Sequence, residues 1–94
     1  EGRYMTIQNL YDTGDFDKVE AEVYSFSQTA GSQSYWLAKA YLVLGDSFVE
    51  RGRYDQAKAT FESIRDGYEP AGGFDDVEDN VNKRLSRLSD LINK

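Results

Sequence analysis

The sequence predicts an all-α fold of about five helices arranged as antiparallel pairs. Three observations lead to this prediction. Apolar residues recur at steps of three and four over most of the 94 residues, which is the period of one face of an α-helix. Glycines and the single proline interrupt this pattern at intervals suited to helix ends. A shift of 38 residues also superposes much of the first half of the chain on the second half, as expected of a repeated helix pair.

The first helix is expected at residues 3–12 and the second at residues 15–28. The first should stop at Gly14. Asp15 can cap the second by accepting free backbone N–H groups, and Gly31 suits the left-handed residue after its end. The apolar faces consist of Tyr4, Ile7, Leu10 and Tyr11 in the first helix and of Phe16, Val19, Val23 and Phe26 in the second.

The third helix, at residues 34–51, is apolar on two stripes. A helix that is apolar around more than half of its circumference is packed between neighbours, so we expect this one in the middle of the fold. Ala38, Ala40 and Gly45 are small and permit close approach of another helix. The two stripes are Leu37, Tyr41, Leu44 and Phe48, and Trp36, Ala40 and Val43.

The fourth helix is expected at residues 53–66. Gly67 and Pro70 follow it in the usual order at a helix C-terminus, a permissive residue before a helix breaker. The connector after it is short and turn-rich, so it is not a domain linker. The apolar face of this helix consists of Ala57, Phe61 and Ile64, followed by Tyr68.

The fifth helix, at residues 76–93, begins with a capping box formed by Asp75 and Glu78. Acidic residues crowd its start and basic residues lie further along, an order that complements the helix dipole. It has one narrow apolar stripe and a charged back, as a terminal capping helix requires. The stripe consists of Val77, Val81, Leu85, Leu88 and Ile92.

One motif spans the third and fourth helices. It consists of Gly45, Gly52, Tyr54, Ala57 and Phe61, with Pro70 further on. This spacing resembles the tetratricopeptide repeat, a helix-turn-helix unit of about 34 residues. The resemblance implies a right-handed superhelical solenoid that binds proteins. The longer period and the phrase SYWLAKAYLVLG are similar to repeats of bacterial cell-envelope proteins, which implies a periplasmic or envelope location, with the cytoplasm left open.

The first half of the chain resembles the same repeat more weakly. The 38-residue shift places Gly14 on Gly52, but it also places Ile7 on Gly45 and so departs from the motif. The upstream unit is therefore interpreted as a degenerate copy.

We expect a single domain over residues 1–94, and a piece of a longer protein because the chain opens EGRYM without an initiator methionine. In this interpretation residues 1–33 form the degenerate repeat, residues 34–71 the clear repeat and residues 74–94 a C-terminal capping helix. An unrelated helical bundle is the alternative, because any helical hairpin shows apolar residues every three or four positions.

Composition excludes several functions. Acidic residues outnumber basic ones 17 to 11, and nucleic-acid binding depends on neutralising phosphates with Lys and Arg, so no nucleic-acid partner is expected. No apolar run approaches the roughly 20 residues that cross a bilayer, so no membrane insertion is expected. The chain has no histidine and no cysteine, which removes the commonest catalytic and zinc-binding groups. We therefore expect no enzyme and no cofactor.

A calcium site was weighed at Asp12, Asp15 and Asp17, which lie close together in sequence. Gly14 and Phe16 occupy positions where an EF-hand loop would need ligands. The interpretation is a helix cap with solvated charges, and no metal site is expected.

In the tetratricopeptide family the first helix of each repeat lines the concave face, and the resemblance implies the same here. The expected partner is an extended or helical segment with basic character, held over an apolar floor with an acidic rim. Val43 stands where the family's carboxylate-clamping repeats carry an asparagine, four residues after Lys39, so binding of a chain terminus is not expected. The predicted partner-binding residues are Lys39, Leu42, Val43, Asp46, Val49 and Glu50 from the clear repeat, and Tyr4, Gln8, Tyr11 and Asp12 from the degenerate one.

Two functions remain open at this point. The first is a non-catalytic scaffold that binds a peptide or protein segment. The second is a purely structural role, in which the chain stacks on flanking repeats or associates with a second copy of itself as a homo-oligomer.

Overall fold

The computed structural model describes residues 2–29, 34–68 and 76–93, which form five α-helices. No strand occurs in these three ranges, so the predicted all-α fold is confirmed. Every observed helix end lies within one residue of its predicted position. The predicted caps at Gly31, Pro70 and Asp75 lie outside the described residues. The helices are α1 (Gly2–Asp12), α2 (Phe16–Thr29), α3 (Ser34–Glu50), α4 (Tyr54–Gly67) and α5 (Asp76–Ile92).

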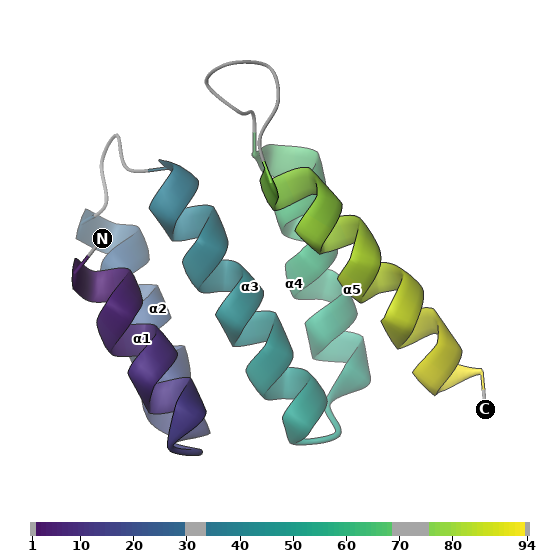
Figure 1. Cartoon of the computed structure of the whole chain (residues 1–94), viewed down its shortest axis with the longest axis horizontal. Helices are drawn as coiled ribbons and strands as arrows, with labels where there is room; N and C mark the ends of the chain where they lie inside the picture. Colours follow the sequence, from purple (N-terminus) through teal and green to yellow (C-terminus); the bar gives the residue numbers. More distant parts are fainter. Residues whose placement is uncertain (1, 30–33, 69–75, 94) are drawn as a thin grey trace.

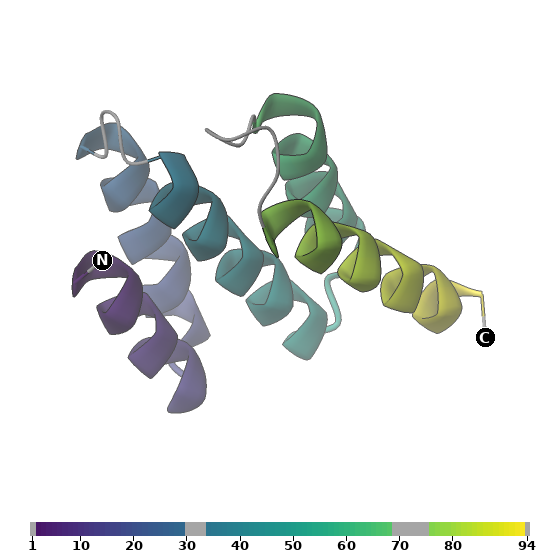
Figure 2. The same ribbon diagram turned by 45° about the horizontal axis from the view of Figure 1, so that its top comes forward.

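The helices form two layers (Figure 1). In the first layer α1, α3 and α5 lie side by side and run in the same direction, and α2 and α4 lie behind them and run in the opposite direction (Figures 1 and 2). α3 is the central element, since it packs against each of the other four helices. Within the described ranges α2 and α4 do not contact each other.

The turns that close the two helix pairs depend on glycine. Gly14, between α1 and α2, has a φ of 83°, and Gly52, between α3 and α4, has a φ of 74°. Glycine adopts this left-handed conformation without the steric penalty that a Cβ atom brings. The two glycines are 38 residues apart, as the internal alignment of the sequence requires.

The backbone hydrogen bonds of these turns also repeat. The N–H of Asp15 donates to the carbonyl of Leu10 at 2.9 Å, and the N–H of Arg53 donates to the carbonyl of Phe48 at 2.8 Å. Both pairs are related by the same 38-residue shift. The two helix pairs therefore share one turn geometry, although their side chains differ.

Asp15 caps α2 differently from the prediction. Its main-chain carbonyl accepts the N–H groups of Lys18 and Val19, each at 3.0 Å. Its carboxylate instead accepts the hydroxyl of Thr13 at 3.2 Å. The sequence predicts that Gly67 follows α4 as its permissive residue, but it is the last residue of the helix, and Tyr68 leaves the helix in an extended conformation.

The core joins all five helices, with Ile7, Val23, Leu44, Phe61 and Leu88 each at most 2% exposed. In α3 the four consecutive residues 42–45 are all buried. Successive helical residues point about 100° apart, so this run can be buried only if neighbours surround the helix. The predicted central position of α3 is confirmed.

The closest approach in the core is between α3 and α4. A Cβ atom added at Gly45 would lie 2.3 Å from Cε1 of Phe61 and 2.6 Å from its Cζ. Two carbon atoms do not approach closer than about 3.5 Å without repulsion. The Phe61 ring therefore occupies the space that any side chain at position 45 would need, and it is itself 1% exposed.

Replacing Gly45 by alanine should lower the free energy of unfolding by about 1–3 kcal/mol, the usual cost of an extra carbon in a packed core. Gly67→Ala is the matched control, because a Cβ atom there meets nothing within 4 Å and alanine is the better helix former. Urea denaturation followed by circular dichroism measures both variants.

A double variant tests the origin of this cost. Phe61→Leu should be less destabilising in the Gly45→Ala protein than in the wild type, because the smaller side chain relieves the clash. Equal effects of Gly45→Ala and Gly67→Ala would contradict the close contact.

Candidate functional site

The predicted partner-binding residues converge on the face formed by α1, α3 and α5. Nine of the ten line one or both of two adjoining hollows on this face. The tenth, Asp12, lines neither hollow, but its carboxylate accepts a hydrogen bond from Nε2 of Gln8 at 3.0 Å. Leu42 and Val43 are 3% and 5% exposed and belong to the core, so they can supply only the floor of a site.

The smaller depression, here called the α1/α3 hollow, has a volume of about 60 Å³. Its α1 wall is fixed by hydrogen bonds along the helix, since the hydroxyl of Tyr4 donates to Oε1 of Gln8 at 3.3 Å. The ring of Tyr4 also packs against Trp36 of α3, with 5.5 Å between ring centroids. The hollow is lined by Tyr4, Gln8, Tyr11, Lys39, Leu42, Val43, Asp46, Asn80 and Arg84.

The larger depression, here called the α3/α5 groove, has a volume of about 310 Å³. It shares Tyr11, Asp46 and Arg84 with the α1/α3 hollow, so the two adjoin. Its lining consists of Tyr11, Asp46, Val49, Glu50, Phe61, Lys83, Arg84, Arg87, Leu88 and Leu91.

The contribution of α5 to this face was not predicted from the sequence, because its single apolar stripe indicated a capping helix. The groove takes Lys83, Arg84 and Arg87 from α5. Arg87 lies four positions after Lys83 and three after Arg84, so the three residues lie on one side of a helix. That spacing is the signal from which the basic wall could have been predicted.

An ion pair between α3 and α5 lies where the two depressions meet. Nε of Arg84 donates to Oδ1 of Asp46 at 2.9 Å, and its Nη2 donates to Oδ2 at 3.0 Å. Nη1 of Arg84 is held by the side-chain oxygen of Asn80 at 3.1 Å. Burial raises the pKa of Asp46 above its ordinary value, while Arg84 acts in the opposite direction. Asp46, predicted as part of an acidic rim, is therefore already paired within the chain.

A second link between the same helices lies at their N-terminal ends. Nζ of Lys39 donates to Oδ2 of Asp76 at 2.9 Å, and the hydroxyl of Tyr35 donates to Oδ1 at 2.8 Å. These two hydrogen bonds lower the pKa of Asp76 below its ordinary value. Burial alone would lower the pKa of Lys39, but the hydrogen bond and charge of Asp76 outweigh it and raise that pKa.

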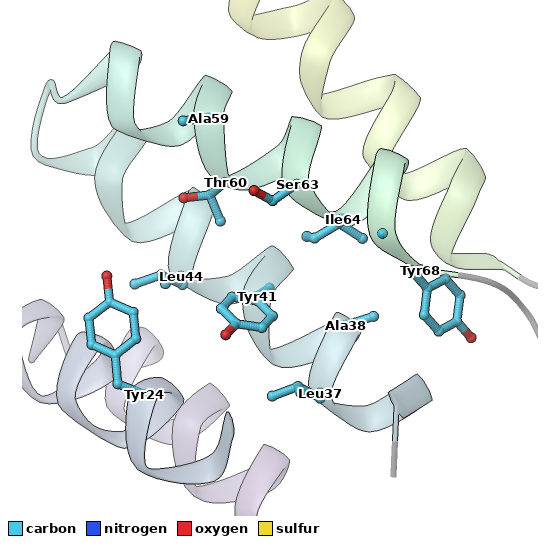
Figure 3. A pocket seen from close by; sticks show the side chains of 11 residues that line it. Tyr24, Leu37, Ala38, Tyr41, Leu44, Ala59, Thr60, Ser63, Ile64 and Tyr68 are labelled. Carbon is cyan, nitrogen blue, oxygen red and sulfur yellow. The ribbon is translucent and has the colours of Figure 1, made fainter. Parts of the chain in front are cut away.

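A further hollow lies on the other side of the molecule, between α2 and α4 and over α3 (Figure 3). This α2/α4 hollow has a volume of about 460 Å³. Tyr24 stands at its edge with 47% of its surface exposed, and Leu37, Tyr41 and Ile64 are among its apolar lining residues. This hollow could not be predicted from the sequence, because helical period alone does not show that α2 and α4 stay apart.

The carboxylates weighed as a calcium site have separate partners. Asp12 accepts from Gln8, Asp15 from Thr13, and Asp17 from Nη1 of Arg51 at 3.1 Å. In the part of the chain that the structure describes, no three acidic side chains are grouped so that they could hold a metal ion. Over the same residues, no helix combines the length and the apolar character that crossing a membrane requires.

Comparison with known proteins gives no match: no family model, no curated protein and no solved structure matches this chain. The resemblance to the tetratricopeptide repeat thus rests on the residues of the chain itself.

Replacing Asp76 by asparagine should cost about 0.2–1 kcal/mol of stability at neutral pH, the range for partly exposed ion pairs. The pKa of Asp76 is lowered from 3.8, so its ionised form stabilises the folded state above pH 3.8. This contribution is lost as the pH falls through the lower pKa of the folded state. Urea denaturation of the wild type and the variant should show their difference shrinking below pH 3.8.

Asp79→Asn is the control for this experiment, since Asp79 lies in the same first turn of α5 and forms no ion pair among the described residues. It corrects for the loss of a negative charge near the helix N-terminus. A cost for Asp76→Asn that persists undiminished in acid would contradict the ionic role of this carboxylate.

Proposed function

We propose that this chain is a non-catalytic interaction domain that binds a peptide or protein segment on its α1/α3/α5 face. One observation carries this proposal. Residues separated by up to 87 positions in sequence, from Tyr4 to Leu91, line two adjoining depressions with an apolar floor and charged walls. A partly charged surface that three helices line suits a protein segment, whereas small-molecule sites are enclosed and mostly apolar.

The internal repeat supports the same function. Two turns with left-handed glycines and matching hydrogen bonds recur 38 residues apart, which is the geometry expected of tandem helix-turn-helix units. We infer a tetratricopeptide-like solenoid in which the α1/α3/α5 face is the concave side and α5 closes the array. The lengthened period favours the bacterial cell-envelope members of that family, and with them an envelope-associated or periplasmic location.

A non-catalytic role fits the chemistry of the face. The chain has no histidine and no cysteine. Two of the carboxylates of the face, those of Asp46 and Asp12, are engaged by Arg84 and Gln8. Such pairing orients side chains and so reduces the entropy that a partner must remove on binding.

Panning a displayed library of random short peptides on the immobilised chain tests this proposal. Peptides should be enriched, and their binding should weaken about tenfold in Glu50→Lys, because Glu50 is exposed at the end of α3 and reversal turns attraction into repulsion. Asp46→Lys is a poor probe, since it also breaks the pair with Arg84.

The control is Asp66→Lys, which reverses an exposed charge in the last turn of α4 in the other layer. It removes only a surface ion pair with the neighbouring Arg65, and such pairs contribute little to stability. It should leave peptide binding unchanged. Failure to enrich any peptide, or equal weakening by both reversals, would contradict binding at this face.

Self-association is the second candidate function, and exposed apolar side chains favour it. Met5 on α1 is 53% exposed and Ile92 on α5 is 46% exposed, and these helices flank α3 in the first layer (Figure 1). Multi-angle light scattering should then give the mass of a dimer or larger species, and Met5→Ser with Ile92→Ser should return it to 10.7 kDa. A monomer at every concentration would exclude this role.

A further inference from the structure

The α3/α5 groove has walls of opposite charge. α3 contributes Asp46 and Glu50, and α5 contributes Lys83, Arg84 and Arg87. Asp46 and Arg84 neutralise each other where the groove meets the α1/α3 hollow. At that end of the groove the opposite charges neutralise each other. The charges further along the two walls, those of Glu50, Lys83 and Arg87, therefore determine which partner the groove attracts.

Those remaining charges have no ion-pair partner among the described residues. Glu50, Lys83 and Arg87 are all exposed. α3 and α5 draw apart toward their C-terminal ends in both views (Figures 1 and 2), which separates the acidic wall from the basic one. The two walls are thus held in an open arrangement.

The acidic wall lies in a negative local field. Glu50 is the last residue of α3 and Asp12 the last residue of α1, and both helices run in the same direction (Figure 1). A carboxylate at a helix C-terminus meets the negative end of the helix dipole, which is unfavourable unless a cation is near. The pKa of Tyr11, beside this wall, is raised first by burial and then by the charges of Asp46 and Glu50.

Between the walls the groove floor is apolar. Val49, Phe61, Leu88 and Leu91 supply it from α3, α4 and α5. Phe61 is held in place by its contact with Gly45, so the floor is part of the packed core and is formed before a partner arrives. An apolar side chain of a partner can bury surface there without rearranging the helices.

From this arrangement we propose that the partner is a protein segment with two charged flanks. It presents an apolar side chain to the groove floor, a basic side chain to Glu50 and an acidic side chain to Lys83 and Arg87. The inference rests on the proposed function and specifies its partner. It adds an acidic side chain to the segment of basic character predicted from sequence, because α5 supplies a basic wall opposite the acidic one.

Opposed charges also fix the direction in which the segment lies. A segment bound in the reverse direction, or one with its two charged flanks exchanged, would place its acidic side chain against Glu50 and its basic side chain against Lys83 and Arg87. Such like-charge contacts are strongly disfavoured. The groove would therefore discriminate between two segments of the same composition by the arrangement of their charges.

The test uses peptides enriched on the wild-type chain and measures their dissociation constants by fluorescence anisotropy. Replacing the basic residue of such a peptide by Glu should weaken its binding to the wild-type chain about tenfold. The same peptide should bind the Glu50→Lys variant as tightly as the original peptide binds the wild type. Replacing the acidic residue of the peptide by Lys should likewise weaken its binding to the wild-type chain and restore its binding to the double variant Lys83→Glu, Arg87→Glu. Asp66→Lys should show no coupling to either peptide reversal.

The outcomes separate this inference from the proposed function. In one outcome the enriched peptides bind on this face, but the effects of peptide and protein charge reversals on the binding free energy are simply additive. That outcome overturns the inference and leaves the proposed function standing. The same holds if the enriched peptides carry only basic residues. If no peptide is enriched, both fail. Circular dichroism of each variant confirms that the helices remain folded.

Discussion

Phe61 packs its ring against the backbone of α3 at Gly45, where the chain carries no side chain to obstruct it. This contact closes the α3–α4 pair, and α3 in turn carries α1, α2 and α5. The same ring forms part of the floor of the α3/α5 groove. In the upstream pair the internal alignment sets Ile7 and Val23 at these positions, and both are buried.

The position of α5 depends on polar contacts as much as on apolar ones. Two sets of side-chain contacts join α5 to α3, the pair of Asp46 with Arg84 and the contacts of Asp76 with Lys39 and Tyr35. Each partly exposed pair contributes little free energy by itself. Their geometric effect is larger, because the bidentate pair of Arg84 fixes the rotation of α5 about its own axis. This rotation places the basic residues Lys83, Arg84 and Arg87 of α5 on the wall of the groove.

The sequence was sufficient for the helices and for one half of the candidate site. Helix ends depend on local rules, so Gly14 and Gly52 could be assigned to turns from their neighbours alone. Residues of α1 and α3 could be assigned to one face because the helical period determines which side chains point the same way. The pairing of Asp46 with Arg84 could not be predicted, since these residues are 38 positions apart and their contact depends on how α5 is rotated. The α2/α4 hollow was also not predicted, because periodicity indicates which residues are buried but not whether two particular helices pack against each other.

The uneven connectivity of the helices has a thermodynamic consequence. Among the described helices α1 and α2 contact only each other and α3, whereas α3, α4 and α5 all contact one another. The α3–α4 turn adds one further link, because Arg51 pairs with two acidic residues of α2. The first helix pair can therefore open as a separate unit while the other three helices stay folded, in the manner of a subglobal opening. Such an opening would remove Tyr4, Gln8 and Tyr11 from the binding face and leave the α5 wall intact. The α1 part of the binding surface would then be lost at a lower free energy than global unfolding requires.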